Sequence, residues 1–166
     1  MKLIAFIPAR LESKRFPNKV LKLIYGIPMI EHVRRRALFS GIFENTYIVS
    51  NSKIIKKKLN KFNPNIIITK KKHHNGTSRT SEVSTNYNFD YAFILFADEP
   101  FINPFKIKKC KQIIKNNNKI DVFNVVTNLK NGDLKSTEVV KCVLDKTGNI
   151  LDYYRNSSKY RSVEKI

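Results

Sequence analysis

Short apolar runs and amphipathic stretches alternate along most of the chain. Residues 3–7 form an apolar run that Pro8 stops, which predicts a buried first strand rather than a helix. Pro28 then stands where the first turn of a helix would be, and apolar residues repeat at helical spacing until Gly41. The opening segment is therefore predicted to form a strand, a long loop and a helix.

The same order of elements recurs further along the chain. Strands are predicted at 46–49, 66–69 and 91–96, and helices at 54–62, at 78–87 and from Asn103 onward. Such alternation predicts an α/β fold, Rossmann-like, in which a mostly parallel twisted sheet has helices on both faces. After residue 120 we expect added β-strands at 122–127, 139–144 and 150–154, the last two joined by a turn.

Length and composition set limits on the kind of protein. A chain of 166 residues that is 42% hydrophobic fits one globular domain with a single core. No stretch approaches the roughly 18 unbroken apolar residues of a membrane span, and the first apolar run is too short for a signal peptide. Cys110 and Cys142 lack metal-ligand spacing and are expected to be reduced thiols. We therefore expect a soluble, cytoplasmic protein with no membrane partner.

The chain is strongly basic, with a formal net charge of +19. Clustered lysines and arginines favour nucleic acid, because they gain affinity by releasing phosphate counterions. Here the lysines are spread over several predicted helix faces rather than along one stripe. An A/T-rich gene, which also enriches Asn, Ile, Phe and Tyr, explains the charge at least as well, so nucleic acid is not an expected partner.

Two polar segments follow predicted strands, and these are the candidates for chemistry. The cationic loop 8–19 follows the first strand, and Asp98 and Glu99 follow the strand at 91–96. Ligands of open parallel sheets bind beyond the carboxyl ends of the strands, so both segments are expected to face one crevice. Cations that hold phosphate oxygens beside a carboxylate that holds Mg²⁺ suit a nucleoside triphosphate. Charge spacing alone leaves a solvated basic turn and a helix-capping carboxylate as equal alternatives.

Other nucleotide sites are not supported by the sequence. The chain contains neither GxxxxGK[ST] nor GxGxxG, so neither a P-loop ATPase nor a dinucleotide-binding oxidoreductase is indicated. The expected phosphate site therefore lacks a Walker motif.

Several segments resemble motifs of a known family and occur in the family's order. Residues 7–19, IPARLESKRFPNK, resemble the signature IPAR-x-x-S-x-R-x-P-x-K of sugar-acid cytidylyltransferases. The later segments are 26–30 (GIPMI, like GKPMI), 73–79 (HHNGTSR, like H-x-S-G-T-D-R), 96–102 (FADEPFI, like QGDEP-x-I) and 140–155 (VKCVLDKTGNILDYYR, like VKVVLDxxGxALYFSR). Together they resemble the 3-deoxy-manno-octulosonate (Kdo) cytidylyltransferase, or CMP-Kdo synthetase, family.

The resemblance implies a fold of the nucleotide-diphospho-sugar transferase kind and an enzyme that joins CTP to a Kdo-like sugar acid. The products would be a CMP-sugar and pyrophosphate, for lipopolysaccharide or surface-glycan biosynthesis. The implied catalytic residues are Arg10, Lys19 and Asp98, with Asp98 as the Mg²⁺ ligand and Arg155 towards the sugar acid. The implied nucleotide-binding residues are Pro8, Ala9, Arg10, Leu11, Ser13, Arg15, Lys19, His73, Gly76, Thr77 and Arg79.

The chain departs from the family pattern at informative positions. Phe96 and Ala97 replace the family's Gln-Gly, which removes a side-chain amide expected near the nucleotide and leaves selectivity between CTP and UTP open. Asn75 and Ser78 replace a serine and an acidic residue in the third motif. Family members also continue well beyond Ile166, with a second metal-binding aspartate.

We therefore expect residues 1–166 to be a single nucleotidyltransferase domain without the family's C-terminal portion. Such a chain should bind nucleotide with impaired turnover, and the missing portion would weaken a family-like homodimer. Two alternatives remain: an acylneuraminate-type cytidylyltransferase, which shares the first motif, and a non-catalytic remnant that still binds nucleotide.

Overall fold

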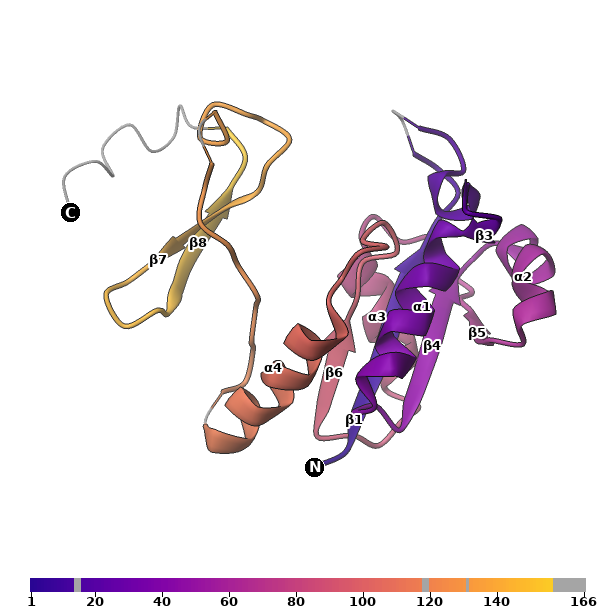
Figure 1. Ribbon diagram of the computed structural model, residues 1–166, viewed down its shortest axis with the longest axis horizontal. Coiled ribbons are helices and arrows are strands. Elements are labelled where there is room, and N and C mark those ends of the chain that lie inside the picture. The colour runs from indigo at the N-terminus through magenta and orange to yellow at the C-terminus, as the bar shows by residue number, and fades with distance from the viewer. Residues whose placement is uncertain (14–15, 118–119, 131, 157–166) are drawn as a thin grey trace. The chain divides into compact units, whose positions relative to one another are not determined.

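The computed structural model describes residues 1–13, 16–117, 120–130 and 132–156. Contacts divide the chain into two compact units, Met1–Ile120 and Asp121–Ile166, which are described separately (Figure 1). The expectation of a single domain over 1–166 stays a prediction. No helix within the described ranges is long and apolar enough to cross a membrane.

The first unit is built on a parallel sheet, which confirms the predicted fold class. The sheet has the strand order β5-β4-β1-β6, and each neighbouring pair is parallel. Its strands are β1 (Leu3–Ala9), β4 (Asn45–Ser50), β5 (Asn65–Ile68) and β6 (Tyr91–Ile94), with a small hairpin of β2 (Leu23–Ile24) and β3 (Ile27–Pro28) outside it. The helices are α1 (Met29–Ser40), α2 (Lys53–Leu59), α3 (Gly76–Ser84) and α4 (Pro104–Asn116), with single 3-10 turns η1 (Lys19–Leu21) and η2 (Asn60–Phe62).

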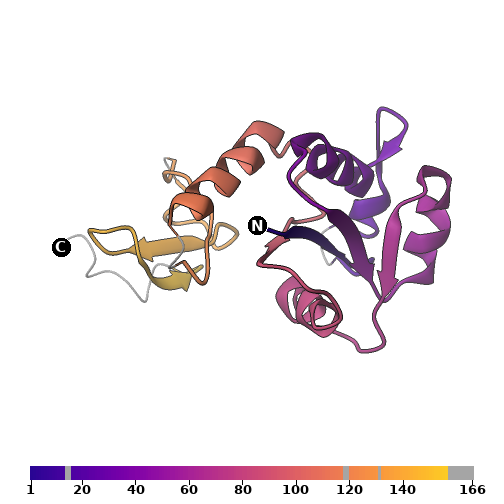
Figure 2. The same ribbon diagram turned by 90° about the horizontal axis from the view of Figure 1, so that it is seen from below.

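Helices cover both faces of this sheet, as Figure 2 shows. Alternate residues of β1 point to opposite faces, because side chains in a strand alternate with a period of two. Leu3, Ala5 and Ile7 pack with buried residues of α1, α2 and α4 in the larger core cluster. Ile4 and Phe6 belong to a second cluster that includes Val83 of α3. Every residue of β1 up to Ile7 is therefore buried, which explains its unbroken apolar run.

Helices α1 and α4 follow the predicted signals, whereas α3 spans Gly76–Ser84 rather than the predicted 78–87. Helix α1 ends at Gly41, whose φ of 66° is the left-handed conformation that glycine adopts at low cost. Helix α4 begins with Pro104 in its first turn, and the Asn103 side chain accepts a hydrogen bond from the Phe105 backbone N–H at 2.8 Å. Both observations confirm the predicted boundaries.

The ends of β1 and β6 each differ from the prediction by two residues. Strand β1 continues through Pro8 to Ala9, because β6 pairs only as far as Phe6 and the proline N–H is not needed on that open side. Strand β6 ends at Ile94 rather than at residue 96. The Leu95 backbone N–H still donates to the Phe6 carbonyl at 2.9 Å, but the pairing stops there and the Phe96 side chain is 55% exposed.

The strand order reverses between β1 and β6. From β1 the chain moves outward through β4 to β5, and it then crosses back to place β6 on the other side of β1. The loops that follow β1 and β6 therefore both start at the carboxyl ends of the strands and run in opposite directions across the sheet. This is the position at which open α/β sheets bind ligands.

The second unit contains an antiparallel hairpin. It pairs β7 (Lys141–Leu144) with β8 (Ile150–Tyr154), which confirms the two later strands and the turn between them. The Asp145 carboxylate closes that turn by accepting hydrogen bonds from the side chains of Asn149 and Thr147, and these bonds lower its pKa to about 2. The expected strand at 122–127 does not form: within the described part of the chain no strand pairs with it, and Val122 is 81% exposed.

Candidate nucleotide-binding site

The loop after β1 turns back on itself, and this turn determines where Lys19 lies. The Asn18 backbone N–H donates to the Leu11 carbonyl at 3.1 Å, and Asn18 itself has a left-handed φ of 56°. Asparagine tolerates this conformation better than most residues do. Lys19 then opens the short helix η1 beside the end of β6.

Lys19 and Asp98 form an ion pair across the strand-order reversal. The Lys19 ammonium donates directly to the Asp98 carboxylate, although the residues are separated by 79 positions in the sequence. The two side chains are 33% and 44% exposed. An ion pair this accessible to water contributes little stability, and each partner can exchange the other for a ligand.

The carboxylates at the end of β6 occupy a tight turn. The Glu99 backbone N–H donates to the Phe96 carbonyl at 3.1 Å. Partial burial of its carboxyl group, followed by the neighbouring Asp98 charge, raises the pKa of Glu99. No cluster of three or more His, Cys, Asp or Glu side chains suited to a metal occurs among the described residues. The donor set at this edge is therefore small and consists of the neighbouring carboxylates of Asp98 and Glu99, both on exposed residues.

Helix α3 begins against the end of β1. Its N-cap Asn75 accepts a hydrogen bond from the Ser78 backbone N–H at 2.8 Å, so the residue that departs from the family motif still caps the helix. Gly76 lies so close to Pro8 that a Cβ atom there would be 2.8 Å from the proline Cγ. Glycine is thus required for this contact. Thr77, which follows it, is exposed in the first turn.

Arg10 links the loop after β1 to the loop that precedes α3. Its guanidinium donates to the His74 carbonyl at 3.3 Å, and its side chain is otherwise exposed. Together with the Gly76 contact, this bond joins two segments that the sequence placed in separate motifs.

Arg79 lies beneath these loops rather than among the exposed groups. It is 3% exposed and donates to the Asn51 side-chain oxygen and to the Thr69 hydroxyl, both at 3.0 Å. Asn51 and Thr69 directly follow β4 and β5, so Arg79 ties α3 to the carboxyl ends of both strands. Burial lowers the pKa of the Arg79 guanidinium, and the nearby Glu12 charge opposes that shift.

His73 faces an acidic residue of α3 that the sequence analysis did not single out. Its ring bonds to the Glu82 carboxylate, whose other oxygen accepts the Lys70 backbone N–H at 3.0 Å. The His73 hydrogen bond, followed by the Lys70 backbone bond, lowers the pKa of Glu82. The one available signal was its helical spacing, since Glu82 lies three residues after Arg79 and shares its side of α3. Asn51 and Thr69 carried no motif and could not have been found.

The remaining residues predicted for the site lie in different parts of the chain. Ala9 is buried as the last residue of β1, and Ser13 lies in the loop that follows it. Arg15 lies outside the described residues. Arg155 belongs to the second unit, where its guanidinium donates to the Glu138 carbonyl at 2.6 Å. Its predicted contact with the sugar acid therefore stays a prediction, as do the binding roles of the others.

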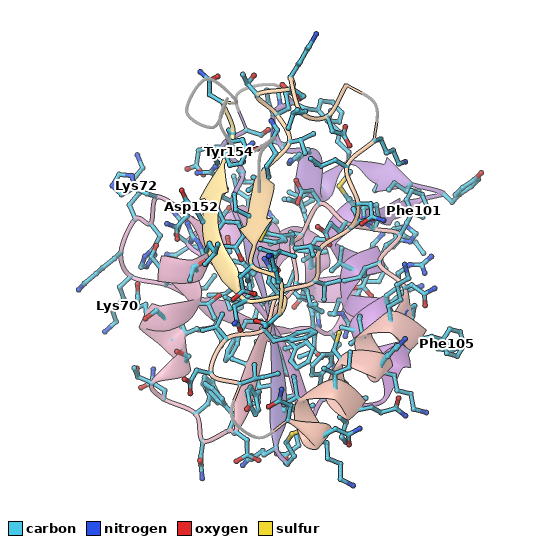
Figure 3. The ribbon with its side chains drawn as sticks, turned by 90° about the vertical axis from the view of Figure 1, so that its left-hand side faces the viewer. Lys70, Lys72, Phe101, Phe105, Asp152 and Tyr154 are labelled. Carbon is cyan, nitrogen blue, oxygen red and sulfur yellow. The ribbon has the colours of Figure 1, made fainter. Side chains whose placement is uncertain are left out.

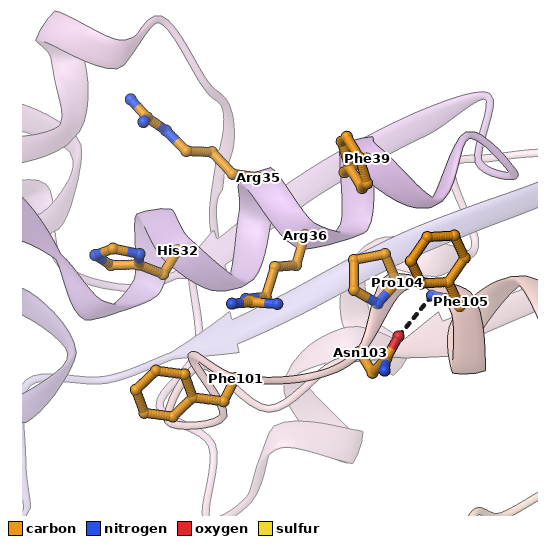
Figure 4. A pocket seen from close by; sticks show the side chains of 8 residues that line it. All are labelled: His32, Arg35, Arg36, Phe39, Phe101, Asn103, Pro104 and Phe105. Atoms are coloured by element: carbon orange, nitrogen blue, oxygen red, sulfur yellow. Dashed lines mark hydrogen bonds between the residues drawn. The ribbon is translucent and has the colours of Figure 1, made fainter.

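A separate open pocket of about 490 Å³ lies between α1 and α4. It is lined by His32, Arg35, Arg36, Phe39, Phe101, Asn103, Pro104 and Phe105 (Figure 4). None of the predicted site residues lines this pocket. In Figure 3 Phe101 and Phe105 project outward from the fold, as do Lys70 and Lys72 of the loop after β5.

Comparison with known proteins connects this arrangement to a family. The sequence profile described as cytidylyltransferase matches residues 4–165. A 3-deoxy-manno-octulosonate cytidylyltransferase of a Nitratiruptor species is 34% identical over 160 residues, which cover 93% of this chain and 66% of that protein. The protein of the same name from Geobacter metallireducens is 31% identical over 157 residues, which cover 94% of this chain and 62% of the relative. The chain thus spans less than two thirds of the length of these curated relatives.

A solved structure shares the fold as well as part of the sequence. The structure of CMP:2-keto-3-deoxy-manno-octonic acid synthetase complexed with CTP aligns with a TM-score of 0.87 and 28% identity, over 100% of this chain and 69% of that one. A cytidylyltransferase from Leptospira borgpetersenii aligns with a TM-score of 0.63 over 72% of this chain and 51% of that one, at 20% identity, and supports the fold alone.

Proposed function

Because this chain belongs to the cytidylyltransferase family, we propose that it binds CTP and transfers CMP to a Kdo-like sugar acid. The products would be the CMP-sugar and pyrophosphate. Such a product would serve lipopolysaccharide or surface-glycan biosynthesis, and the reaction would take place in the cytoplasm.

The observation that carries the proposal is the meeting of Lys19 and Asp98 across the strand-order reversal. A triphosphate needs cations for its oxygens and a carboxylate for the accompanying metal, within one crevice. The ion pair holds both groups at that position before any ligand arrives. Its exposure means that separating the two side chains costs little.

Each side of the crevice would contribute different groups to the nucleotide. Arg10 and Lys19 would donate to phosphate oxygens, together with backbone N–H groups of the loop after β1. The first turn of α3, with Gly76 and Thr77, points its free N–H groups to the same edge and favours negative charge there. Buried Arg79 would fix the start of α3 from below.

The donor set fits Mg²⁺, which usually takes one or two carboxylates and completes its octahedron with phosphate oxygens and water. Asp98 would hold the ion, and the ion would neutralise charge on the triphosphate. Of the two neighbouring carboxylates, Asp98 is the one that meets Lys19 of the opposite loop, and we assign the metal to it.

In the proposed reaction the anomeric hydroxyl oxygen of the sugar acid attacks the α-phosphorus of CTP in line. A new oxygen–phosphorus bond forms, the bond to the β-phosphate oxygen breaks, and the hydroxyl proton is lost to water or a base. Arg10 and Lys19 would offset the charge that builds up on the departing pyrophosphate. Holding both substrates in this geometry can supply roughly 7 to 11 kcal/mol of the barrier.

Calorimetric titration with CTP, UTP and ATP in the presence of Mg²⁺ tests the nucleotide. We expect CTP to bind more tightly than ATP, with weak discrimination against UTP because Phe96 offers no side-chain amide. Lys19→Ala should weaken CTP binding, whereas Lys108→Ala, at an exposed position of α4, should not. The absence of nucleotide binding, or a preference for ATP, would contradict the proposal.

Pyrophosphate release tests the acceptor. CTP and Mg²⁺ are supplied with Kdo or with an acylneuraminate, using this chain and a version extended with a family C-terminal segment. Release with Kdo alone supports the proposal, whereas release with the acylneuraminate alone favours the alternative family. If both versions bind CTP and neither releases pyrophosphate, the chain is a nucleotide-binding protein without this activity.

A further inference from the structure

Glu82 links α3 to the loop that precedes it. The loop 70–75 leaves the carboxyl end of β5 and enters α3 at Gly76. The Glu82 carboxylate, two turns into the helix, accepts a hydrogen bond from the Lys70 backbone N–H at 3.0 Å and bonds to the His73 ring. The loop is therefore fastened at its first residue and near its middle by a single side chain.

The fastened loop is in turn bonded to the phosphate-binding side of the candidate site. His74 follows His73, and its carbonyl accepts the Arg10 guanidinium at 3.3 Å. Two hydrogen bonds, joined by the covalent backbone between His73 and His74, thus connect Glu82 to Arg10. The Glu82 and His73 side chains are 23% and 11% exposed, so this part of the chain is better shielded from water than Lys19 and Asp98 are.

We propose that Glu82 is a positioning residue for nucleotide binding, which holds the loop 70–75 so that the His74 carbonyl directs Arg10 towards the triphosphate. This inference rests on the proposed function, because it assigns Arg10 to the nucleotide. Glu82 does not touch the ligand. The inference also gives His73 a role, as the hydrogen-bond partner of Glu82, that needs no direct contact with the nucleotide.

The experiment compares Glu82→Ala, Glu82→Gln and Glu44→Gln in the full chain. Glu44 is the matched control, because it also forms an ion pair, with Lys2, and that pair is exposed. Lys2 and Glu44 directly precede β1 and β4, so they lie at the amino ends of these strands, away from the candidate site. Glu82→Gln keeps an oxygen for the Lys70 N–H but loses the charge that pairs with His73. CTP affinity with Mg²⁺ is measured by calorimetry, and melting temperature is measured without ligand.

We expect Glu82→Ala to weaken CTP binding about fivefold or more, the lower end of what coupling between distinct elements produces. Glu82→Gln should be intermediate, and Glu44→Gln should bind CTP like the wild-type chain. The Arg10→Ala background separates positioning from general loss of structure: if Glu82 acts through Arg10, adding Glu82→Ala to Arg10→Ala should weaken binding by less than about twofold more. Equal effects in both backgrounds, or wild-type binding by Glu82→Ala, would overturn the inference.

Amide hydrogen exchange in the ligand-free chain distinguishes failure of this inference from failure of the proposed function. Glu82→Ala should speed exchange in the loop 70–75 and also in residues 9–12, whereas Glu44→Gln should affect neither segment. If the wild-type chain binds no CTP, the proposed function fails, and coupled exchange still decides whether Glu82 holds Arg10 in place. If exchange in 9–12 is unchanged, the inference fails even where CTP binds. Should Glu82→Ala not fold, Glu82→Gln, measured in the wild-type and Arg10→Ala backgrounds, provides the second comparison.

Discussion

The candidate site has an exposed half and a buried half. Lys19 and Asp98 form a solvent-exposed ion pair, in which about a third or more of each side chain is accessible to water. Arg79 is 3% exposed, and both of its described partners follow strands of the sheet. The exposed pair can be parted by a ligand at little cost. The buried arginine cannot leave without unsatisfied polar atoms, so it determines where α3 begins.

This contrast separates binding from stability. Groups that must exchange partners with a triphosphate should contribute little to the folded state. Groups that only hold the loops in place should contribute much more. The following substitutions test that division, from the largest expected effect to the smallest.

Arg79→Ala should have the largest effect on stability. It removes a buried charge and leaves the Asn51 and Thr69 oxygens without their donor, at a cost of about 3 kcal/mol. Thermal unfolding without ligand should show a loss of roughly 10 °C. Arg36→Ala is the matched control, since that half-buried guanidinium of α1 makes a long bond of 3.4 Å to the Ile102 carbonyl. Equal losses for the two variants would erase the contrast between the halves.

Gly76→Ala should come next. Alanine usually stabilises a helix relative to glycine, but here its Cβ would lie 2.8 Å from Pro8 Cγ and would push α3 away from β1. Overpacking of this kind costs about 1 to 2 kcal/mol. Ser81→Ala, at an exposed position of the same helix, should be neutral or slightly stabilising. A gain in melting temperature for Gly76→Ala would show that the contact with Pro8 yields easily.

Glu99→Gln and Glu82→Gln should change stability in opposite directions at neutral pH. The pKa of Glu99 is raised, so the folded state binds more protons than the unfolded state. Stability therefore falls as the pH rises from the ordinary glutamate pKa towards the raised pKa of the folded state. Glu99→Gln should therefore melt higher than the wild-type chain at neutral pH. The gain should vanish near about pH 4, around the ordinary glutamate pKa.

The pKa of Glu82 is lowered, so its contribution is present above the ordinary glutamate pKa and is lost as pH falls through the folded pKa. Glu82→Gln should melt lower at neutral pH, and the deficit should shrink on acidification. Melting curves from neutral to acidic pH measure both variants. Shifts of the same sign would contradict the assigned pKa directions.

Lys19→Ala should have the smallest effect on stability and a clear effect on binding. An exposed ion pair contributes about 0.5 kcal/mol or less, so melting without ligand should hardly change. Loss of a cation from a triphosphate site should still weaken CTP binding about tenfold. A large loss of stability would instead assign the ion pair a structural role and break the comparison.

Much of the fold could be predicted from local patterns. The apolar run of β1 and the caps of α1 and α4 are determined by a few neighbouring residues, and the structure confirms them. The errors arose where pairing partners decide the outcome. Strand β1 passes through Pro8 because β6 has already ended, and 122–127 pairs with no strand among the described residues.

The sequence by itself determined the fold class, the two charged segments and the glycine that begins α3. These depend on periodicity, residue type and spacing along the chain. Only the tertiary structure decided that Lys19 meets Asp98, that Arg79 is buried and that Glu82 reaches back to His73. Each depends on residues brought together from different elements or turns, because burial and hydrogen-bond partners are properties of the packed sheet and helices and leave no local pattern in the sequence.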